Sequence, residues 1–301
     1  MGIARPQKVR LATVGILALV LGAGFLLGAA WSGRSRAATA ADPNRGDLAG
    51  ERGERRPAIY ERVSPPLTPD QLAAFSQCFG ELDIHHMTEH VFPHLPQVRV
   101  LSNVKKDGKS IGITKGGMHW HSDLSYKPQP ALVTLLYAVE CPPSGADTQF
   151  ADMYAAFADL PEAKRKNLQQ MRAVHDRNFR YSELYPGRPP LSAEQVAKVP
   201  PVEHPLVRVH PATGRPALFV AKDVVSRITG LPEAESRALI DELEAFATRP
   251  ELVYSHKWQP GDVLVWDNRC TLHRATPYDP QYRRTLYRTQ VKGETPVAMT
   301  A

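Results

Sequence analysis

The stretch Trp120-His121-Ser122-Asp123 is the point around which the rest of the chain is organised. In an extended strand, side chains two positions apart point to the same face. His121 and Asp123 would then direct one nitrogen ligand and one oxygen ligand toward a common point. A histidine and an acid two residues apart also occur together by chance, and in isolation the pair is read as a surface histidine beside a carboxylate. The rest of the chain must decide between these readings.

A third candidate ligand, His273, ends the distant stretch Trp266-Asp267-Asn268-Arg269-Cys270-Thr271-Leu272-His273. Two histidines and one carboxylate on one face of a metal form the facial triad of non-haem Fe(II) oxygenases, which leaves positions open for substrates. The combination predicts a metal site made of His121, Asp123 and His273.

Length and charge exclude one class of protein. The 301 residues suffice for one large domain or two small ones, and 27 prolines favour many turns. The net charge is +6, but residues 1–62 hold ten Lys or Arg and five Asp or Glu, so the remainder is close to neutral. A nucleic-acid-binding protein concentrates basic residues on its folded part, so we expect no nucleic-acid partner.

The three cysteines are too few and too scattered to define a site. Cys78, Cys141 and Cys270 are odd in number and far apart in the sequence. They predict neither a disulfide framework nor a Cys-rich zinc site, and they fit a reducing compartment.

The N-terminal segment has the features of a targeting sequence. Basic residues precede an apolar run over residues 11–31, and Ala38-Thr39-Ala40 follows. Residues 1–40 therefore read as a secretory signal or as a membrane anchor, since 21 apolar residues can span a bilayer. Residues 41–66 are polar and charged and read as a linker. We expect a cytoplasmic protein or one anchored to the inner membrane with its domain facing the cytoplasm, and the sequence does not exclude export.

The folded domain is expected over residues 67–301. Thr68, Pro69 and Gln71 form a helix start, with a capping box and a proline in the first turn, and Gly80 is expected to end this helix. A second helix is predicted from Pro232 to about Thr248. Short apolar runs predict strands at 111–114, 132–139, 207–210, 217–221 and 263–266. Many strands, few helices and converging ligands predict a mainly β fold with flanking helices, a jelly roll.

Several blocks of this sequence resemble the TauD/TfdA family of Fe(II)- and 2-oxoglutarate-dependent dioxygenases. The most specific block runs from His273 to Arg288 and reads His-Arg-Ala-Thr-Pro-Tyr-Asp-Pro-Gln-Tyr-Arg-Arg-Thr-Leu-Tyr-Arg. The other blocks are Phe79-Gly80-Glu81-Leu82, the Trp-His-Ser-Asp stretch, Gly145-Ala146-Asp147-Thr148 and Gly261-Asp262. The resemblance covers roughly residues 67–295. It implies a cupin-like double-stranded β-helix that uses Fe(II), O2 and 2-oxoglutarate as cosubstrate.

The resemblance also implies a role for individual residues. It makes His121, Asp123 and His273 the iron ligands. It further implies that Arg284 and Thr148 bind the distal carboxylate of 2-oxoglutarate, and that His85 and Arg288 contact the substrate.

The chemistry of the two arginines agrees with these roles. A guanidinium is always charged and forks onto a carboxylate through two hydrogen bonds. Arg284 and Arg288 are four residues apart, so on a strand both would point to one side, and Arg283 and Tyr287 would point away.

Two features depart from the family pattern. Members usually have apolar strands before the segment that starts here at Leu67, whereas this chain has a charged linker. Glu54-Arg55-Arg56-Pro57 does not read as a buried strand, so we expect missing strands and an open sheet edge. Gly117 occupies the position of a substrate-side asparagine, which argues against taurine as substrate.

The resemblance predicts hydroxylation of a small anionic organic substrate, with release of succinate and CO2. Arg288 favours a sulfonate, an alkyl sulfate or an aryloxyalkanoate. The alternative is a catalytically inactive jelly-roll binding module or pseudoenzyme tethered to the membrane. Assembly into a homo-oligomer is compatible with the sequence.

Overall fold

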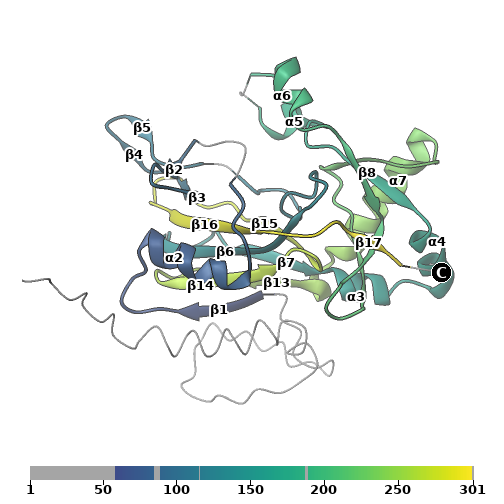
Figure 1. Ribbon diagram of the computed structural model, residues 1–301, viewed down its shortest axis with the longest axis horizontal. Coiled ribbons are helices and arrows are strands. Elements are labelled where there is room, and N and C mark those ends of the chain that lie inside the picture. The colour runs from purple at the N-terminus through teal and green to yellow at the C-terminus, as the bar shows by residue number, and fades with distance from the viewer. Residues whose placement is uncertain (1–57, 85–88, 115, 187–188, 300–301) are drawn as a thin grey trace, which may run out of the picture. The chain divides into compact units, whose positions relative to one another are not determined.

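A six-stranded antiparallel sheet forms the larger wall of the fold. The computed structural model describes residues 58–84, 89–114, 116–186 and 189–299, and Figure 1 shows their arrangement. The strands lie in the order β1, β14, β6, β16, β3, β2. Their bounds are β1 (Ala58–Arg62), β14 (Asp262–Asp267), β6 (Ala131–Glu140), β16 (Thr285–Lys292), β3 (Leu95–Ser102) and β2 (Val91–Phe92).

A three-stranded sheet forms the opposite wall. Its strands lie in the order β13 (Val253–His256), β7 (Thr148–Asp152), β15 (Thr271–Ala275). Phe150 of β7 packs against large-sheet side chains in one buried cluster, which holds Ala58, Leu136, Ala138, Trp258, Leu264, Trp266 and Leu286. Two antiparallel sheets packed over a shared apolar core are a jelly roll, as the sequence predicted.

The outer face of the large sheet is buried as well. Alternate residues of β6 face opposite ways, so Leu136 points into the core between the sheets, and Leu135 packs under the helix α2 (Pro69–Ser76) with its buried Leu72. Figure 1 shows α2 lying against this sheet. Burial on both faces explains why β6 reads as a continuous apolar run rather than an alternating one.

The start of α2 is formed as the sequence predicted. The Thr68 hydroxyl accepts a hydrogen bond from the Gln71 backbone N–H at 3.2 Å, and the Gln71 side chain accepts one from the Thr68 N–H at 2.9 Å. A short 3-10 helix, η2 (Gln77–Phe79), follows and ends at Gly80. Gly80 has a φ of 141°, and a Cβ there would lie 2.9 Å from Val291, so a larger residue would strain this end.

Residues 153–252 form a mixed insertion between β7 and β13. The long helix α7 (Glu233–Ala247) confirms the helix expected at 232–248, and it buries Ile240, Leu243 and Ala247. The shorter helices are α3 (Met153–Ala158), α4 (Glu162–Gln169), α5 (Tyr181–Leu184), α6 (Ala193–Ala197) and η3 (Pro250–Leu252). One small sheet joins β12 (Val225–Ile228), β8 (Arg172–His175) and β9 (Val202–Pro205). The other joins β11 (Pro216–Leu218), β10 (Val207–Val209) and β17 (Val297–Ala298).

Two local predictions were wrong. Residues 111–114 are not a strand, because the chain there leaves the short hairpin of β4 (Lys105–Lys106) and β5 (Lys109–Ser110), and Ile111 is exposed. His121 and Asp123 do not share a strand either. His121 makes a single bridge to His273, and a turn starts at Asp123.

The expected linker over residues 41–66 contains a strand of the main sheet. The strand β1 pairs with β14 from Ala58 opposite Trp266 to Arg62 opposite Asp262, and the Arg62 Nε lies 2.8 Å from Asp262. The linker prediction is therefore wrong for residues 58–62, and β14 is not left as the open edge that we expected. The strand was not predicted because Glu61 and Arg62 are charged, and charged residues are tolerated on an edge strand.

The predictions for residues 1–40 lie outside the described residues. These include the signal-like segment and the membrane anchor through residues 11–31. Within the part of the chain that the structure describes, no helix combines the length and apolar character needed to cross a membrane.

Candidate active site

His121, Asp123 and His273 converge between the two sheets. The backbones of His121 and His273 exchange two hydrogen bonds, N to O at 3.0 and 2.8 Å, which brings their rings to 4.2 Å between centroids. The Asp123 Oδ1 lies 3.8 Å from the His121 Nε2, and its Oδ2 lies 3.7 Å from the His273 Nε2. The bridge between His121 and His273, together with the turn that starts at Asp123, thus brings the distant His273 to the neighbouring pair His121 and Asp123.

Both imidazoles are prepared to accept a metal. The Nδ1 of His121 lies 2.7 Å from the His119 carbonyl oxygen, so this nitrogen donates a hydrogen bond and Nε2 is the atom directed toward Asp123. Burial, together with the neighbouring His121, lowers the pKa of His273 to about 3, so its ring is neutral near pH 7. Two imidazoles and one carboxylate are the donor set that Fe(II) accepts, so these residues fit the metal that the sequence predicted.

Asp123 is held in place by residues that the sequence did not indicate. The Thr134 hydroxyl of β6 donates to Asp123 Oδ2 at 2.7 Å, and Asn268 donates to Thr134 at 2.9 Å. The Asn268 side-chain oxygen accepts the Asp123 backbone N–H at 3.2 Å and the Trp266 indole N–H at 3.1 Å. Burial opposes ionisation of Asp123, but His273 and the Arg288 guanidinium keep its pKa well below the ordinary value.

Sequence signals for these supporting residues were weak. Asn268 lies in the stretch that contains His273, and its closeness to a candidate ligand was the one clue. Thr134 gave no clue, because it is one β-branched residue in an apolar run, and only its place on the inner face of β6 directs it to Asp123.

Arg284 is a buried cation that lacks a carboxylate partner. It is 9% exposed, and no ion pair joins its side chain to an acid within the described residues. Burial lowers its pKa, and the Tyr278 ring lies 5.7 Å from its guanidinium carbon. A buried guanidinium in this state requires an anion.

Thr148 lies in the same region of the fold. It pairs with Ala275 across β7 and β15, and the nearby Gly145 backbone approaches Tyr278, which contacts Arg284. The Trp258 indole N–H donates to the Thr148 hydroxyl oxygen at 3.0 Å. Because that oxygen already accepts, its own proton remains available for an anion such as a carboxylate.

Arg288 points to the predicted metal ligands. Its Nη1 lies 3.7 Å from Asp123 Oδ1, and on β16 it shares a face with the core residue Leu286. Arg284 directly precedes this strand. Tyr287 points to the other face, where it contacts Phe92 at 5.2 Å between ring centroids. The side of the strand expected for Arg288 is confirmed, whereas His85 lies outside the described residues.

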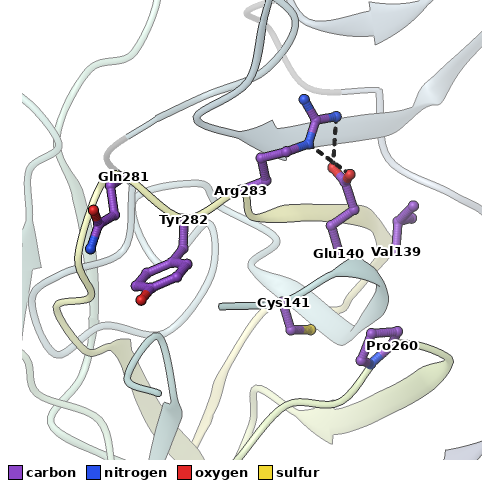
Figure 2. Close-up of a pocket in the computed structure, with 7 residues that line it drawn as sticks. All are labelled: Val139, Glu140, Cys141, Pro260, Gln281, Tyr282 and Arg283. Carbon is purple, nitrogen blue, oxygen red and sulfur yellow. Dashed lines mark hydrogen bonds and ion pairs between the residues drawn. The ribbon is translucent and has the colours of Figure 1, made fainter. Parts of the chain in front are cut away.

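A surface pocket lies beside Arg284 but on the outside of the fold. Figure 2 shows the side chains that line this pocket, with Arg283 and Glu140 joined as an ion pair. The pocket has a volume of about 450 Å³, and the Arg283 Nε lies 2.8 Å from the Glu140 carboxylate. The pocket is lined by Val139, Glu140, Cys141, Pro260, Gln281, Tyr282 and Arg283. Arg283 and Arg284 therefore point in opposite directions, as alternation along a strand predicts, and the pocket contains none of the predicted site residues.

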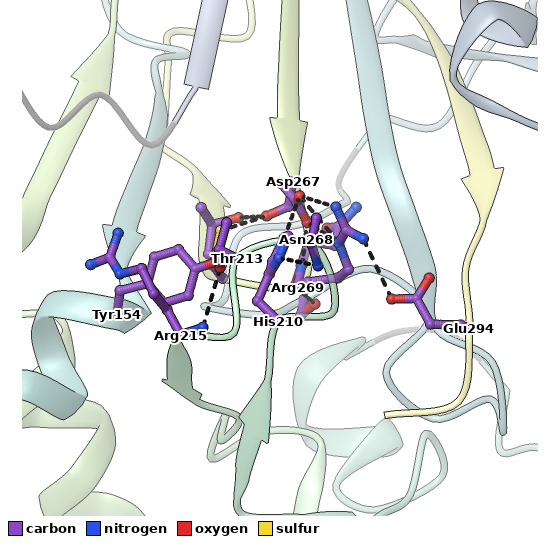
Figure 3. Close-up of polar contacts among 12 residues, drawn as sticks. Tyr154, His210, Thr213, Arg215, Asp267, Asn268, Arg269 and Glu294 are labelled. Atoms are coloured by element: carbon purple, nitrogen blue, oxygen red, sulfur yellow. Dashed lines mark hydrogen bonds and ion pairs between the residues drawn. The ribbon is translucent and has the colours of Figure 1, made fainter. Parts of the chain in front are cut away.

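A second group of potential ligands lies next to the first. His210, Asp267 and Cys270 are buried, and their donor atoms lie within 4.8 Å of one another. Figure 3 shows that the Asp267 carboxylate already has polar partners within the protein. Its carboxylate accepts hydrogen bonds from the Arg269 side chain at 2.6 and 2.9 Å and lies 3.0 Å from the His210 Nε2. Arg269 therefore supplies to Asp267 the positive charge that a metal ion would otherwise bring. The cluster stabilises the turn between β14 and β15 that leads to His273.

Comparisons with known proteins identify similar chains over most of this length. The family model for taurine catabolism dioxygenase TauD, TfdA family, matches residues 62–290. The alpha-ketoglutarate-dependent 2,4-dichlorophenoxyacetate dioxygenase of Burkholderia sp. (strain RASC) is 40% identical over 238 residues, 76% of this chain and 79% of the relative. The (S)-phenoxypropionate/alpha-ketoglutarate-dioxygenase of Sphingobium herbicidovorans is 34% identical over 248 residues, 78% of this chain and 82% of the relative.

Solved structures give the same result for the fold. The crystal structure of AAD-2 in complex with Mn(II) and N-oxalylglycine is 30% identical and superposes with a TM-score of 0.70. The match covers 80% of this chain and 86% of that one. The residues matched by the family model include every predicted site residue, from His85 to Arg288.

Proposed function

Because the chain belongs to the TauD/TfdA family and is an Fe(II)- and 2-oxoglutarate-dependent dioxygenase, we propose that it hydroxylates a small organic anion. 2-Oxoglutarate would be converted to succinate and CO2, and the substrate would be oxidised at a C–H bond. The observation that carries the proposal is the convergence of two histidines and one aspartate, with Nε2-to-carboxylate distances of 3.8 and 3.7 Å, beside the Arg288 guanidinium.

His121, Asp123 and His273 would hold the metal. Bound iron supplies the oxygen chemistry, and the protein supplies position and a shielded pocket. The His119 carbonyl fixes the orientation of the His121 ring, and Thr134 fixes the orientation of the Asp123 carboxylate. Supporting hydrogen bonds of this kind set ring and carboxylate orientation at metal sites.

Arg284 and Thr148 would hold the distal carboxylate of 2-oxoglutarate. The buried, unpaired Arg284 guanidinium would fork onto that carboxylate, and the Thr148 hydroxyl would donate to it while accepting from Trp258. The cosubstrate's keto acid end would then be directed toward the metal ligands.

Arg288 would hold the anionic group of the substrate. Its position 3.7 Å from Asp123 puts a bound anion next to the metal ligands, so a C–H bond a few atoms from the anionic group would lie near the metal. Relatives named for 2,4-dichlorophenoxyacetate and phenoxypropionate support an aryloxyalkanoate, and sulfonates and alkyl sulfates fit the same charge. We infer a cytoplasmic site of action, since 2-oxoglutarate is a cytoplasmic metabolite.

The proposal is tested by titration of the full chain with Fe(II) and then 2-oxoglutarate under anaerobic conditions. A visible charge-transfer band between iron and the keto acid is expected. Arg284→Met should raise the 2-oxoglutarate concentration at half-saturation at least about tenfold, since hydrogen bonds to charged groups stabilise by about 1.5–3 kcal/mol. Arg283→Met is the matched control, because its outward side chain should leave the titration unchanged.

The same samples distinguish the enzyme from an inactive binding module. His273→Ala should lose both the band and succinate formation when oxygen is admitted. A folded parent protein that shows no band would contradict the metal assignment and would favour the binding module.

A further inference from the structure

Arg99 lies directly opposite Arg288 on the inner face of the large sheet. The register of β3 against β16 pairs these two residues, and residues directly opposite each other point to the same face. Their neighbours confirm the face, because Leu101 and Leu286 pack into the core between the sheets. Two guanidinium groups therefore line the wall that also carries Asp123's partner Thr134.

Each guanidinium keeps one buried donor that the protein leaves unpaired. Arg99 is 5% exposed, and the Arg288 side chain is 16% exposed. The Nε of each is buried and has no hydrogen-bond partner among the described residues, and the Gln290 Nε2 on the same face of β16 is also unpaired. Three donors on one wall thus point to a ligand rich in acceptor atoms.

Arg99 also forms no direct ion pair. No carboxylate forms an ion pair with it in the described part of the chain. The charge of Asp123, a predicted metal ligand, raises the Arg99 pKa, whereas the like charges of Arg288 and Arg177 lower it. Burial and Arg288 lower the pKa of Arg99 to about 10. Burial raises the pKa of the adjacent Tyr126 to about 12, so this phenol is neutral and cannot balance the charge. Like charges directly opposite each other on a sheet are destabilising, so this arrangement costs stability.

The bound metal and cosubstrate would not remove this imbalance. On the proposed function, the charges of ferrous iron, 2-oxoglutarate, Asp123 and Arg284 cancel one another. Arg288 would then be released from its contact with Asp123, and Arg99 and Arg288 would share the wall with no acid between them. Buried charges are paired in stable proteins, so two negative charges are missing.

We propose that Arg99 is a second guanidinium of the substrate site, and that Arg99 and Arg288 together select a substrate whose head group carries two negative charges. This inference rests on the proposed function and deepens it. A tetrahedral phosphonate or phosphate monoester supplies two charges and three acceptor oxygens, which match the two guanidiniums and Gln290. A carboxylate or sulfonate supplies one charge, so it would bind at the same site more weakly, with one arginine left uncompensated.

The test uses the full chain loaded with Mn(II) and 2-oxoglutarate without oxygen, so that binding is measured without turnover. Three probes share one phenoxymethyl group: phenoxymethylphosphonate, phenoxymethanesulfonate and phenoxyacetate. Calorimetry is performed at about pH 8.5, where the phosphonate is a dianion. We expect the phosphonate to bind at least about tenfold more tightly than either monoanion, which is the effect of one further charged hydrogen-bonded contact.

Variants assign the preference to Arg99. Arg99→Met should bring the three affinities to within about twofold of one another, whereas Arg288→Met should weaken all three probes. Arg227→Met, on the exposed face of β12, is the matched control and should change nothing. A phosphonate preference that survives in Arg99→Met would mean that the probe binds the metal or another site, and it would overturn the proposal.

The thermal midpoint of Arg99→Met is a second measurement, and it distinguishes a ligand-binding arginine from a purely structural one. Removing an uncompensated buried charge should raise the thermal midpoint of the unliganded Arg99→Met protein, whereas loss of a structural contact would lower it. If Arg99→Met does not fold, the affinity ratio of the unaltered protein still decides, since equal binding of phosphonate and sulfonate would refute the two-charge site. If the anaerobic Fe(II) titration gives a normal charge-transfer band but calorimetry shows no phosphonate preference, this inference alone is refuted. If the folded parent protein gives no band, the proposed function is refuted.

Discussion

Replacing Asp267 with asparagine should destabilise the protein through the turn that leads to His273. The Asp267 side chain is 7% exposed, and it accepts hydrogen bonds from the Arg269 backbone, Nε and Nη2 and contacts His210. Asparagine keeps one acceptor oxygen and no charge, so the buried Arg269 guanidinium would lose its main partner. Breaking a buried ion pair costs about 3–5 kcal/mol. For a chain of this size this corresponds to a midpoint about 10 °C lower.

The effect has a defined dependence on pH. Burial opposes ionisation of Asp267, but Arg269 and His210 hold its pKa well below the ordinary value. A lowered folded-state pKa means that the stabilisation is complete above the unfolded pKa, about 4, and is lost as pH falls toward the folded-state pKa. The difference in unfolding free energy between the parent and Asp267→Asn should therefore be constant near neutrality and shrink below about pH 4.

The assay is urea unfolding followed by tryptophan fluorescence, at several pH values from neutral to acid. The matched control is Asp241→Asn, because Asp241 also pairs with an arginine, Arg237 at 3.3 Å, but is 56% exposed. That exposed pair should be worth less than about 1 kcal/mol. A loss at Asp267 no larger than at Asp241, or one that is unchanged in acid, would refute the account of the buried cluster.

Three further predictions concern the site and its supports. Thr134→Val removes the hydroxyl that orients Asp123, so the affinity for Mn(II) should fall about 10–100-fold in a metal titration, and an unchanged affinity would contradict the supporting role. Trp258→Phe removes the indole N–H that fixes the Thr148 hydroxyl, so 2-oxoglutarate affinity should fall about tenfold with unchanged metal affinity. Thr68→Ala removes the cap of α2 and should cost about 1 kcal/mol in urea unfolding without altering the charge-transfer band; a loss of the band would link α2 to the site.

Local chemistry was readable from the sequence where it depends on close neighbours. The capping box at Thr68, the helix at residues 233–247 and the alternation of Arg283 with Arg284 all follow from short-range geometry, and the structure contains each of them. The resemblance added the ligand set, because its blocks carry the residue types together with their spacing. The position of His85 relative to the substrate stays a prediction, since it lies outside the described residues.

The tertiary structure decided everything that depends on register between distant strands. Ala58–Arg62 became a strand because β14 offered an edge, although its charged residues resemble a linker. Thr134 supports Asp123 because the inner face of β6 carries it there, and a shift of one residue would turn it outward. Arg99 faces Arg288 across 189 positions of sequence by the pairing of β3 with β16. Sequence specifies which groups a strand carries, whereas cross-strand register, set by packing of the whole core, specifies which groups meet.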